Sequence, residues 1–243
     1  MKITIAQLQV GRDLVKNKER ILHVLSSAHA HDWVIFPEGM LSGYFPEDAG
    51  FLESLDAARI EAGIRQIQQI VTDRQCTCLL GSVVLTQDRW HNAVIALSSS
   101  GQQHRYHKIE LSALDRQHFS PGGGVVAYEI DGTCFGIQAC RELLFPQSWM
   151  DLKSAGSKII FHINNAIQRH DGLWKHLLIG RAIEQGIFVC SVNNAAPPQT
   201  LASYLIDPSG RVILETDPQR DQTLSAEIDL GQSILDLSKR TDY

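Results

Sequence analysis

The chain has 243 residues, of which 44% are hydrophobic and 20% charged, with a formal net charge of −5 and a pI near 6.0. These values are typical of a globular domain, and there is none of the long basic runs by which proteins bind nucleic acid. The longest apolar stretches are far shorter than the roughly 18–20 residues of a membrane-spanning helix. The sequence therefore predicts a protein that binds neither nucleic acid nor a membrane.

The N-terminal sequence and the number and spacing of the cysteines indicate the cellular compartment of the protein. Residues 2–9 alternate as a strand and lack the charged start, apolar middle and cleavage site of a signal peptide. The five cysteines are an odd number without disulfide-framework spacing, and Cys76 and Cys78 lack the two-residue gap of zinc motifs. We expect a cytoplasmic protein without a metal site, whose cysteines are mostly small core residues.

Strand-like and helix-like patterns alternate along the first half of the chain. Apolar runs of strand length predict strands at 2–9, 33–36, 78–85, 91–97 and 102–106. Helical spacing of apolar residues predicts helices over 16–29 and 56–74. In the second of these, Ile60, Ile64, Ile67 and Val71 form one apolar stripe for core packing.

The second half continues the alternation. Strands are predicted at 125–130 and 133–139, joined by Asp131-Gly132, which is a strong hairpin signal. Helices are predicted over 145–155 and 173–185, with strands at 158–163, 188–192, 202–206, 212–214 and 224–228. Because no linker, repeat or composition break interrupts the chain, we expect a single α/β domain over residues 1–243.

Three polar residues lie at the ends of predicted strands. Glu38 follows the buried run Val34-Ile35-Phe36-Pro37, Lys108 ends the strand through Tyr106, and Cys140 ends the strand 133–139. In open α/β folds, functional groups collect at the carboxyl ends of strands. We therefore expect Glu38, Lys108 and Cys140 to meet in one site.

The chemistry explains why these residue types belong together. A thiol attacks well only as thiolate, so Glu38 would take the proton of Cys140 and later pass it to the leaving nitrogen. Lys108 offers a cation for the oxyanion of a tetrahedral intermediate, and the backbone N–H of Arg141 offers a second donor. Taken singly, each residue also has a plain structural interpretation, as a loop carboxylate, a solvated lysine or an inert core thiol.

Several motifs, in order along nearly the whole chain, resemble those of the nitrilase superfamily of carbon–nitrogen hydrolases. They are Phe36-Pro37-Glu38 with Gly43-Tyr44, His91-Asn92-Ala93-Val94, Tyr106-His107-Lys108 with Phe119-x-Pro121-Gly122, and Cys140-Arg141-Glu142-Leu143-Leu144-Phe145-Pro146. In the second half, Arg181-Ala182-Ile183-Glu184, Asn193 and the segment 203–210 are similar to the family's late helix, strand and hairpin.

The resemblance implies a four-layer α-β-β-α sandwich, paired into a homodimer or higher oligomer, that works without metal or organic cofactor. It also implies a covalent thioester or thioimidate on Cys140 that water resolves. Many members use a second carboxylate after the lysine. The matching residue here is Asp115, where the family commonly has the longer Glu, and Glu110 is its rival for the role.

Residues outside the three also qualify as pocket residues. Tyr44 and Phe45 are predicted to line one pocket, although both would also fit a packed loop. By the resemblance, Asn164 or Asn165 forms the pocket wall.

The two residues after the nucleophile each have more than one interpretation. Arg141 would meet a substrate carboxylate through its guanidinium, or be solvated. Glu142 would hold Lys108 in an ion pair, orient a loop, or contact substrate. Structural ion pairing is the favoured role of Glu142.

We predict a hydrolase that cleaves a non-peptide carbon–nitrogen bond in a small amide or N-carbamoyl compound. Nitrile hydrolysis is less favoured, because the nucleophile segment lacks the Trp-Glu that many nitrilases carry after the cysteine. Two further hypotheses are acyl transfer to an amine and a non-catalytic binding or scaffold role on the same fold. The shorter Asp115 favours the scaffold role.

Overall fold

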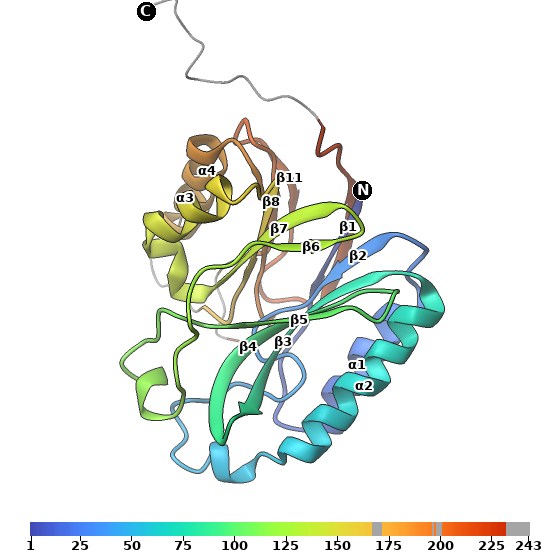
Figure 1. Ribbon diagram of the computed structural model, residues 1–243, viewed down its shortest axis with the longest axis vertical. Helices are drawn as coiled ribbons and strands as arrows, with labels where there is room; N and C mark the ends of the chain where they lie inside the picture. The colour runs from blue at the N-terminus through green and yellow to red at the C-terminus, as the bar shows by residue number, and fades with distance from the viewer. Residues whose placement is uncertain (167–171, 196, 198–200, 232–243) are drawn as a thin grey trace, which may run out of the picture.

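The computed structural model describes residues 1–166, 172–195, 197 and 201–231, and its centre is a pair of six-stranded sheets packed face to face (Figure 1). The first sheet has the order β12-β1-β2-β3-β4-β5. Its strands are β1 (Lys2–Gln7), β2 (Asp32–Ile35), β3 (Thr77–Thr86), β4 (Arg89–Leu97), β5 (Gln103–His107) and β12 (Gln222–Glu227).

The second sheet has the order β11-β10-β9-β8-β7-β6. Its strands are β6 (Tyr128–Ile130), β7 (Thr133–Ala139), β8 (Ile159–Ile163), β9 (Phe188–Val192), β10 (Tyr204–Ile206) and β11 (Val212–Glu215). The predicted hairpin is confirmed: Ile130 pairs with Thr133, and both turn residues have positive φ, 49° at Asp131 and 74° at Gly132. Positive φ at both central positions is the geometry of a type I′ turn.

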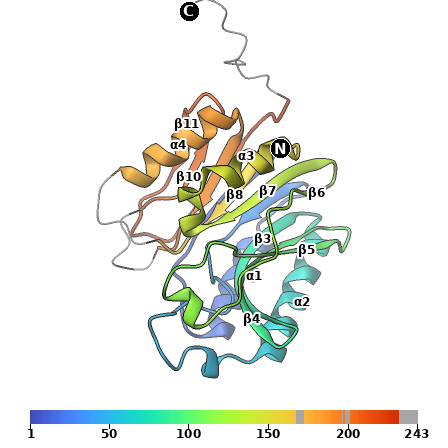
Figure 2. The same ribbon diagram turned by 60° about the vertical axis from the view of Figure 1, so that its left-hand side comes forward.

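Helices cover the outer face of each sheet, so the predicted four-layer α-β-β-α sandwich is confirmed. Helices α1 (Leu14–Ser26) and α2 (Ala57–Arg74) pack on the first sheet, and α3 (Pro146–Ser154) and α4 (Leu173–Gln185) on the second (Figure 2). Three short 3₁₀ turns occupy Leu52–Ser54, Asp115–Gln117 and Cys140–Leu144. Among the described residues, no helix combines the length and hydropathy needed to cross a membrane.

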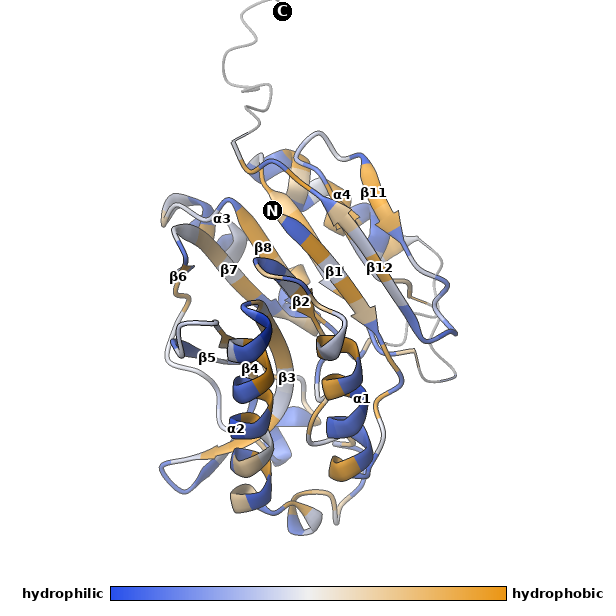
Figure 3. Cartoon of the chain, turned by 90° about the vertical axis from the view of Figure 1, so that its right-hand side faces the viewer, coloured by the Kyte–Doolittle hydropathy of each residue, from blue (hydrophilic) through white to orange (hydrophobic). Residues whose placement is uncertain are grey.

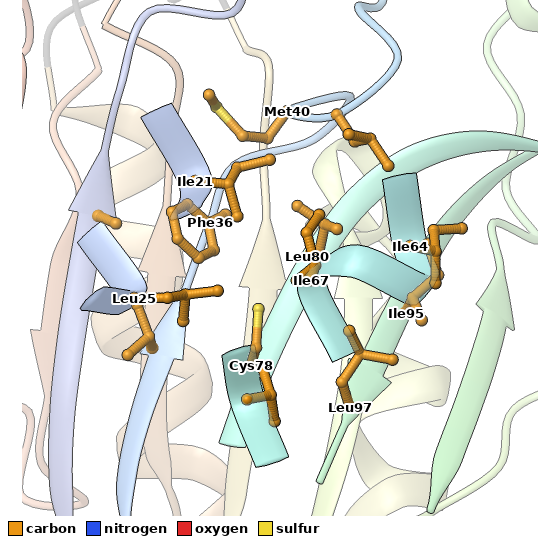
Figure 4. Packing of buried hydrophobic residues seen from close by; sticks show 14 of the residues in the cluster. Ile21, Leu25, Phe36, Met40, Ile64, Ile67, Cys78, Leu80, Ile95 and Leu97 are labelled. Atoms are coloured by element: carbon orange, nitrogen blue, oxygen red, sulfur yellow. The ribbon is translucent and has the colours of Figure 1, made fainter. Parts of the chain in front are cut away.

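Apolar packing holds the four layers together. Between the sheets, Trp33 stacks on Phe161 at 5.4 Å and meets Phe135 edge-on at 5.3 Å. Outside the first sheet, Ile21 of α1 and Ile67 of α2 pack with side chains of β3 and β4 (Figure 4). Hydrophilic residues lie beside these apolar ones on both helices, as expected for half-buried helices (Figure 3).

The strand directions bring the expected site residues to one end of the sandwich. Strand β5 runs parallel to β2, because β3–β4 and β4–β5 are both antiparallel while β2–β3 is parallel. In the other sheet β7, β8 and β9 are parallel. Glu38, Lys108 and Cys140 each follow the carboxyl end of one of these strands.

Several predicted elements are shorter than expected, and two of them flank the segment that carries Cys140. The helix expected over 145–155 begins at Pro146, because proline favours the first turn of a helix and Cys140–Leu144 forms a separate 3₁₀ turn. The strand expected over 125–130 pairs only over Tyr128–Ile130.

A glycine allows β3 to approach the turn that carries Glu38. A Cβ on Gly81 would lie 2.4 Å from the Pro37 carbonyl oxygen and 2.6 Å from the Glu38 Cα. Contacts this short with backbone atoms require the chain to shift, so Gly81 is a condition for the position of Glu38.

We predict that Gly81→Ala destabilises the protein by about 1–3 kcal/mol or more, because the new methyl overpacks the turn. The control is Gly180→Ala within α4, where a Cβ meets nothing within 4 Å and should stabilise by roughly 0.5–1 kcal/mol. Urea unfolding midpoints measure both effects. Equal stability of Gly81→Ala and the parent would contradict the close approach.

Candidate active site

A buried lysine lies between two buried carboxylates at the end of the sandwich. Lys108 Nζ is 3.1 Å from Glu38 Oε1 and 3.0 Å from Asp115 Oδ2, and the three side chains are 2%, 1% and 0% exposed. Burial acts to lower the pKa of Lys108, but the charges of Glu38, Cys140 and Asp115 outweigh it and raise the pKa. Lys108 is therefore a fixed cation at neutral pH.

Glu38 is held by donors from three parts of the chain. Its Oε1 accepts from Asn92 Nδ2 at 2.7 Å and from Lys108 Nζ, and its Oε2 accepts from the Asn165 backbone N–H at 2.9 Å. Asn92, on β4, appeared in the sequence only as part of a motif and was not predicted as a site residue. The feature that could have identified Asn92 is its position on β4, which pairs with β5, the strand that leads to Lys108.

Asp115 reaches Lys108 despite its short side chain. Its backbone lies in a 3₁₀ turn held by Ser112, whose N–H donates to Asp115 Oδ2 at 3.1 Å, and the Tyr44 hydroxyl donates to Oδ1. Burial acts to raise the pKa of Asp115, but Lys108 and Tyr44 outweigh it and lower the pKa. The Glu110 carboxyl makes no hydrogen bond or ion pair to residues that the structure describes, so Asp115 is the second carboxylate at Lys108.

Cys140 lies at the turn from β7 into the 3₁₀ helix, with a φ of +49°. This left-handed conformation is uncommon for a residue with a side chain and is typical of functional turns. Burial raises the pKa of the thiol to about 12, and the charge of Glu38 adds to this while Lys108 opposes it. A hydrogen bond from the Asn165 backbone N–H also favours the thiolate. At rest the nucleophile is therefore a protonated thiol among Glu38, Lys108 and Asp115.

His162 supports the strained turn at Cys140, and the sequence did not predict this role. His162 Nε2 is 2.8 Å from the Cys140 carbonyl oxygen, and Nδ1 is 3.1 Å from Ser191 Oγ. Burial lowers the pKa of His162 to about 4, so the ring is neutral at pH 7. A neutral ring that donates from Nε2 must accept at Nδ1. His162 therefore anchors the Cys140 backbone, not its sulfur.

The predicted pair Asn164 and Asn165 both contact Glu38 through their backbones. The Asn164 carbonyl accepts the Glu38 N–H at 3.2 Å, while its buried side-chain amide donates to Ser191 Oγ at 2.8 Å, and the Asn165 N–H donates to Glu38 Oε2. Phe45 packs against the cluster that contains Tyr44, and it also lines a cavity of about 320 Å³, whose other lining residues include Arg12, Asp48, Phe51 and Arg59 and none of the catalytic candidates.

The two residues after the nucleophile contact backbone. Arg141 Nη1 donates to the Leu111 carbonyl at 2.6 Å, and its guanidinium lies 5.4 Å from the Phe145 ring centroid. Glu142 makes no ion pair with Lys108, so the favoured ion-pairing role is wrong. Its carboxylate accepts backbone N–H groups of the loop after Lys108, which is the loop-orienting role.

A thiol, a carboxylate and a buried ammonium meet at one end of this four-layer sandwich, and comparison with known proteins identifies its family. The model of the carbon–nitrogen hydrolase family matches residues 2–234. The chain therefore belongs to this family, and the resemblance to the nitrilase superfamily is confirmed.

Two relatives and one solved structure show how the chain compares within the family. A glutamine-dependent NAD(+) synthetase of Xylella fastidiosa is 31% identical over 87% of the chain, which spans only 41% of that protein. A 2-oxoglutaramate amidase of Bacillus subtilis is 29% identical over 96% of the chain and 93% of its own length. An amidase variant of Nesterenkonia, bearing the acetamide moiety of fluoroacetamide on its active-site cysteine, has a TM-score of 0.84 at 17% identity and covers 95% of this chain and 90% of its own.

Titration of Cys140 tests the electrostatics of the site. Because the pKa of the thiol is raised to about 12, its alkylation by iodoacetamide should accelerate about tenfold per pH unit from neutral pH upward, without a plateau near the value of about 8.5 of a free thiol. Glu38→Gln removes a negative charge that raises this pKa, so its alkylation at neutral pH should be faster.

Peptide mass spectrometry of the alkylated protein provides the measurement. Glu110→Gln is the matched control, since the Glu110 carboxyl has no polar partner in the described ranges, and it should alkylate like the parent. A plateau below pH 9 in the parent, or slower alkylation in Glu38→Gln, would contradict the arrangement.

Proposed function

We propose that the protein hydrolyses the carbon–nitrogen bond of a small amide or N-carbamoyl compound through a thioester on Cys140. The observation that carries the proposal is the cluster in which the partly exposed Cys140 interacts electrostatically with the buried and paired Glu38 and Lys108. A protonated thiol beside a carboxylate is ready for proton transfer at the moment of attack.

In the acylation step, Glu38 takes the Cys140 proton as Sγ bonds to the carbonyl carbon. The oxyanion that forms is stabilised by Lys108 Nζ and by the backbone N–H of Arg141, which lies in the first turn of the 3₁₀ helix and has no intrahelical partner. Glu38 then gives the proton to the nitrogen, the carbon–nitrogen bond breaks, and ammonia or an amine leaves.

In the deacylation step, water takes the place of the departed amine. Glu38 accepts a proton from this water as its oxygen attacks the thioester carbon, and the same two donors hold the second oxyanion. Its collapse breaks the carbon–sulfur bond, and the proton returns from Glu38 to the sulfur. Asp115 stays ionised throughout and keeps Lys108 charged and oriented.

The names of the relatives suggest which amides to test first. Glutamine and 2-oxoglutaramate are both five-carbon acids with a terminal primary amide and a carboxylate at the other end. We propose short carboxylate-bearing primary amides as the first substrate class, with N-carbamoyl compounds second.

We predict that Cys140→Ala reduces ammonia release from such amides to the uncatalysed background, because no covalent intermediate can form. Cys134→Ala is the matched control, since Cys134 is also partly exposed and its thiol donates to the Ala155 carbonyl and to none of the site residues, and it should turn over normally. Mass spectrometry of the parent mixed with substrate should show an acyl adduct on Cys140. Undiminished turnover by Cys140→Ala would disprove the proposal.

Product analysis separates hydrolysis from the competing reactions. Added hydroxylamine would yield a hydroxamate if acyl transfer to amines competed with water, and nitriles would release ammonia if the site hydrolysed them to the acid. Asp115 lies 3.0 Å from Lys108 despite its shorter side chain, which supports the hydrolase proposal over a non-catalytic scaffold.

A further inference from the structure

One buried carboxylate accepts four hydrogen bonds beside the site without touching the reacting groups. Glu142 Oε1 accepts the backbone N–H groups of Ile109 at 2.7 Å and Glu110 at 3.1 Å. Its Oε2 accepts the Tyr106 hydroxyl at 2.6 Å and the Ala139 N–H at 2.5 Å. The side chain is 1% exposed, and no cation among the described residues pairs with it.

Such a group is costly for the fold alone. A buried charge without a counter-ion pays a large desolvation penalty, and well-packed apolar residues are often as stable or more stable in its place. The four hydrogen bonds offset only part of this cost, since burial still raises the pKa of Glu142. The position of the four donors therefore indicates what the carboxylate contributes.

The donors come from both sheets and flank two of the site residues. Tyr106 and Ile109 lie on either side of Lys108, at the end of β5 in the first sheet. Ala139 and Glu142 itself lie on either side of Cys140, at the end of β7 in the second sheet. One carboxylate thus joins the residues around the cation to the residues around the nucleophile.

Arg141, the residue before Glu142, adds a contact to Leu111, the residue after Glu110. Its guanidinium donates to the carbonyl of Leu111, at 2.6 Å, so consecutive residues after Cys140 bind consecutive residues after Lys108. The bound segment leads directly into the turn of Asp115. Sheet-to-sheet packing alone sets such distances loosely, because apolar contacts are not directional.

We propose that Glu142 is a positioning residue that fixes Lys108 relative to Cys140 across the two sheets, with the Tyr106 hydroxyl as its side-chain partner. It touches neither the substrate nor the reacting atoms. The turnover measurement below rests on the proposed hydrolysis, whereas the alkylation measurement needs no substrate.

The test uses Glu142→Gln and the milder Tyr106→Phe, with Tyr128→Phe as control. The Tyr128 hydroxyl donates only to the Arg105 carbonyl at 3.4 Å, so its loss removes a hydroxyl nearby without touching the Glu142 contacts. A misplacement of about 1 Å costs on the order of 10²-fold in rate. We expect Glu142→Gln to lower kcat by about this factor with KM changed by less than about twofold, Tyr106→Phe to lower kcat less, and Tyr128→Phe to behave as the parent.

Alkylation of Cys140 at neutral pH provides the second readout. Lys108 lowers the pKa of the thiol, so its displacement should slow alkylation in Glu142→Gln several-fold. Loss of a negative charge by itself would have the opposite effect and speed alkylation. Slower alkylation therefore reports a displaced Lys108 and not an altered charge.

The outcomes separate this proposal from the proposed function. Slower Cys140 alkylation in Glu142→Gln or, if that variant does not fold, in Tyr106→Phe supports the positioning role, even if no amide is turned over by the parent. Unchanged alkylation in folded variants overturns it, as does a loss of activity expressed in KM with kcat unchanged. Equal losses in Tyr106→Phe and Tyr128→Phe also overturn it.

Discussion

The burial of one ammonium group between two carboxylates is the constraint on which the rest of the site depends. A buried lysine is tolerated only if its charge is compensated at short range, and Glu38 and Asp115 compensate the charge of Lys108 at 3.1 and 3.0 Å. The two carboxylates bring a net negative charge, which needs further donors. Asn92, Asn165 and Tyr44 supply them, and each comes from a different part of the chain.

The same charges explain why the nucleophile rests as a thiol. Two buried carboxylates outnumber the single cation, and burial itself disfavours the thiolate, so the pKa of Cys140 lies at about 12. A permanently charged sulfur would add a third negative group to a site with one positive charge. The proposed mechanism, in which Glu38 accepts the proton as the sulfur attacks, avoids that state.

The residues that support the site are brought to it by tertiary contacts. Those named next contact the backbone around the site residues and are not assigned a contact with substrate. His162 binds the carbonyl of Cys140 at 2.8 Å, and Gly81 leaves room for the turn of Glu38. Glu142 binds both strand ends that lead into the site. The shorter Asp115 reaches Lys108 because Ser112 holds its turn, so the departure from the family's usual Glu is absorbed locally.

The sequence determined the elements and the three residues of the site. Periodicity predicted α4 and β9 with the bounds that the structure shows, and Asp131-Gly132 predicted the hairpin, because these signals depend on residues close together in the chain. Glu38, Lys108 and Cys140 were candidates because each lies shortly after a predicted strand, and the resemblance to the nitrilase superfamily joined them into one predicted site.

The tertiary structure decided which neighbours of these residues face the site. Asn164 and Asn165 could not be told apart, and Glu142 was assigned a wrong partner. Asn164 and Asn165 follow the end of β8, and Glu142 lies in a 3₁₀ turn, so no strand periodicity tells which direction their side chains take. The partners of a buried polar group also come from segments far away in the chain, as Ile109 does for Glu142. No local sequence pattern predicts which distant segments supply these partners, because only the packing of the two sheets brings them together.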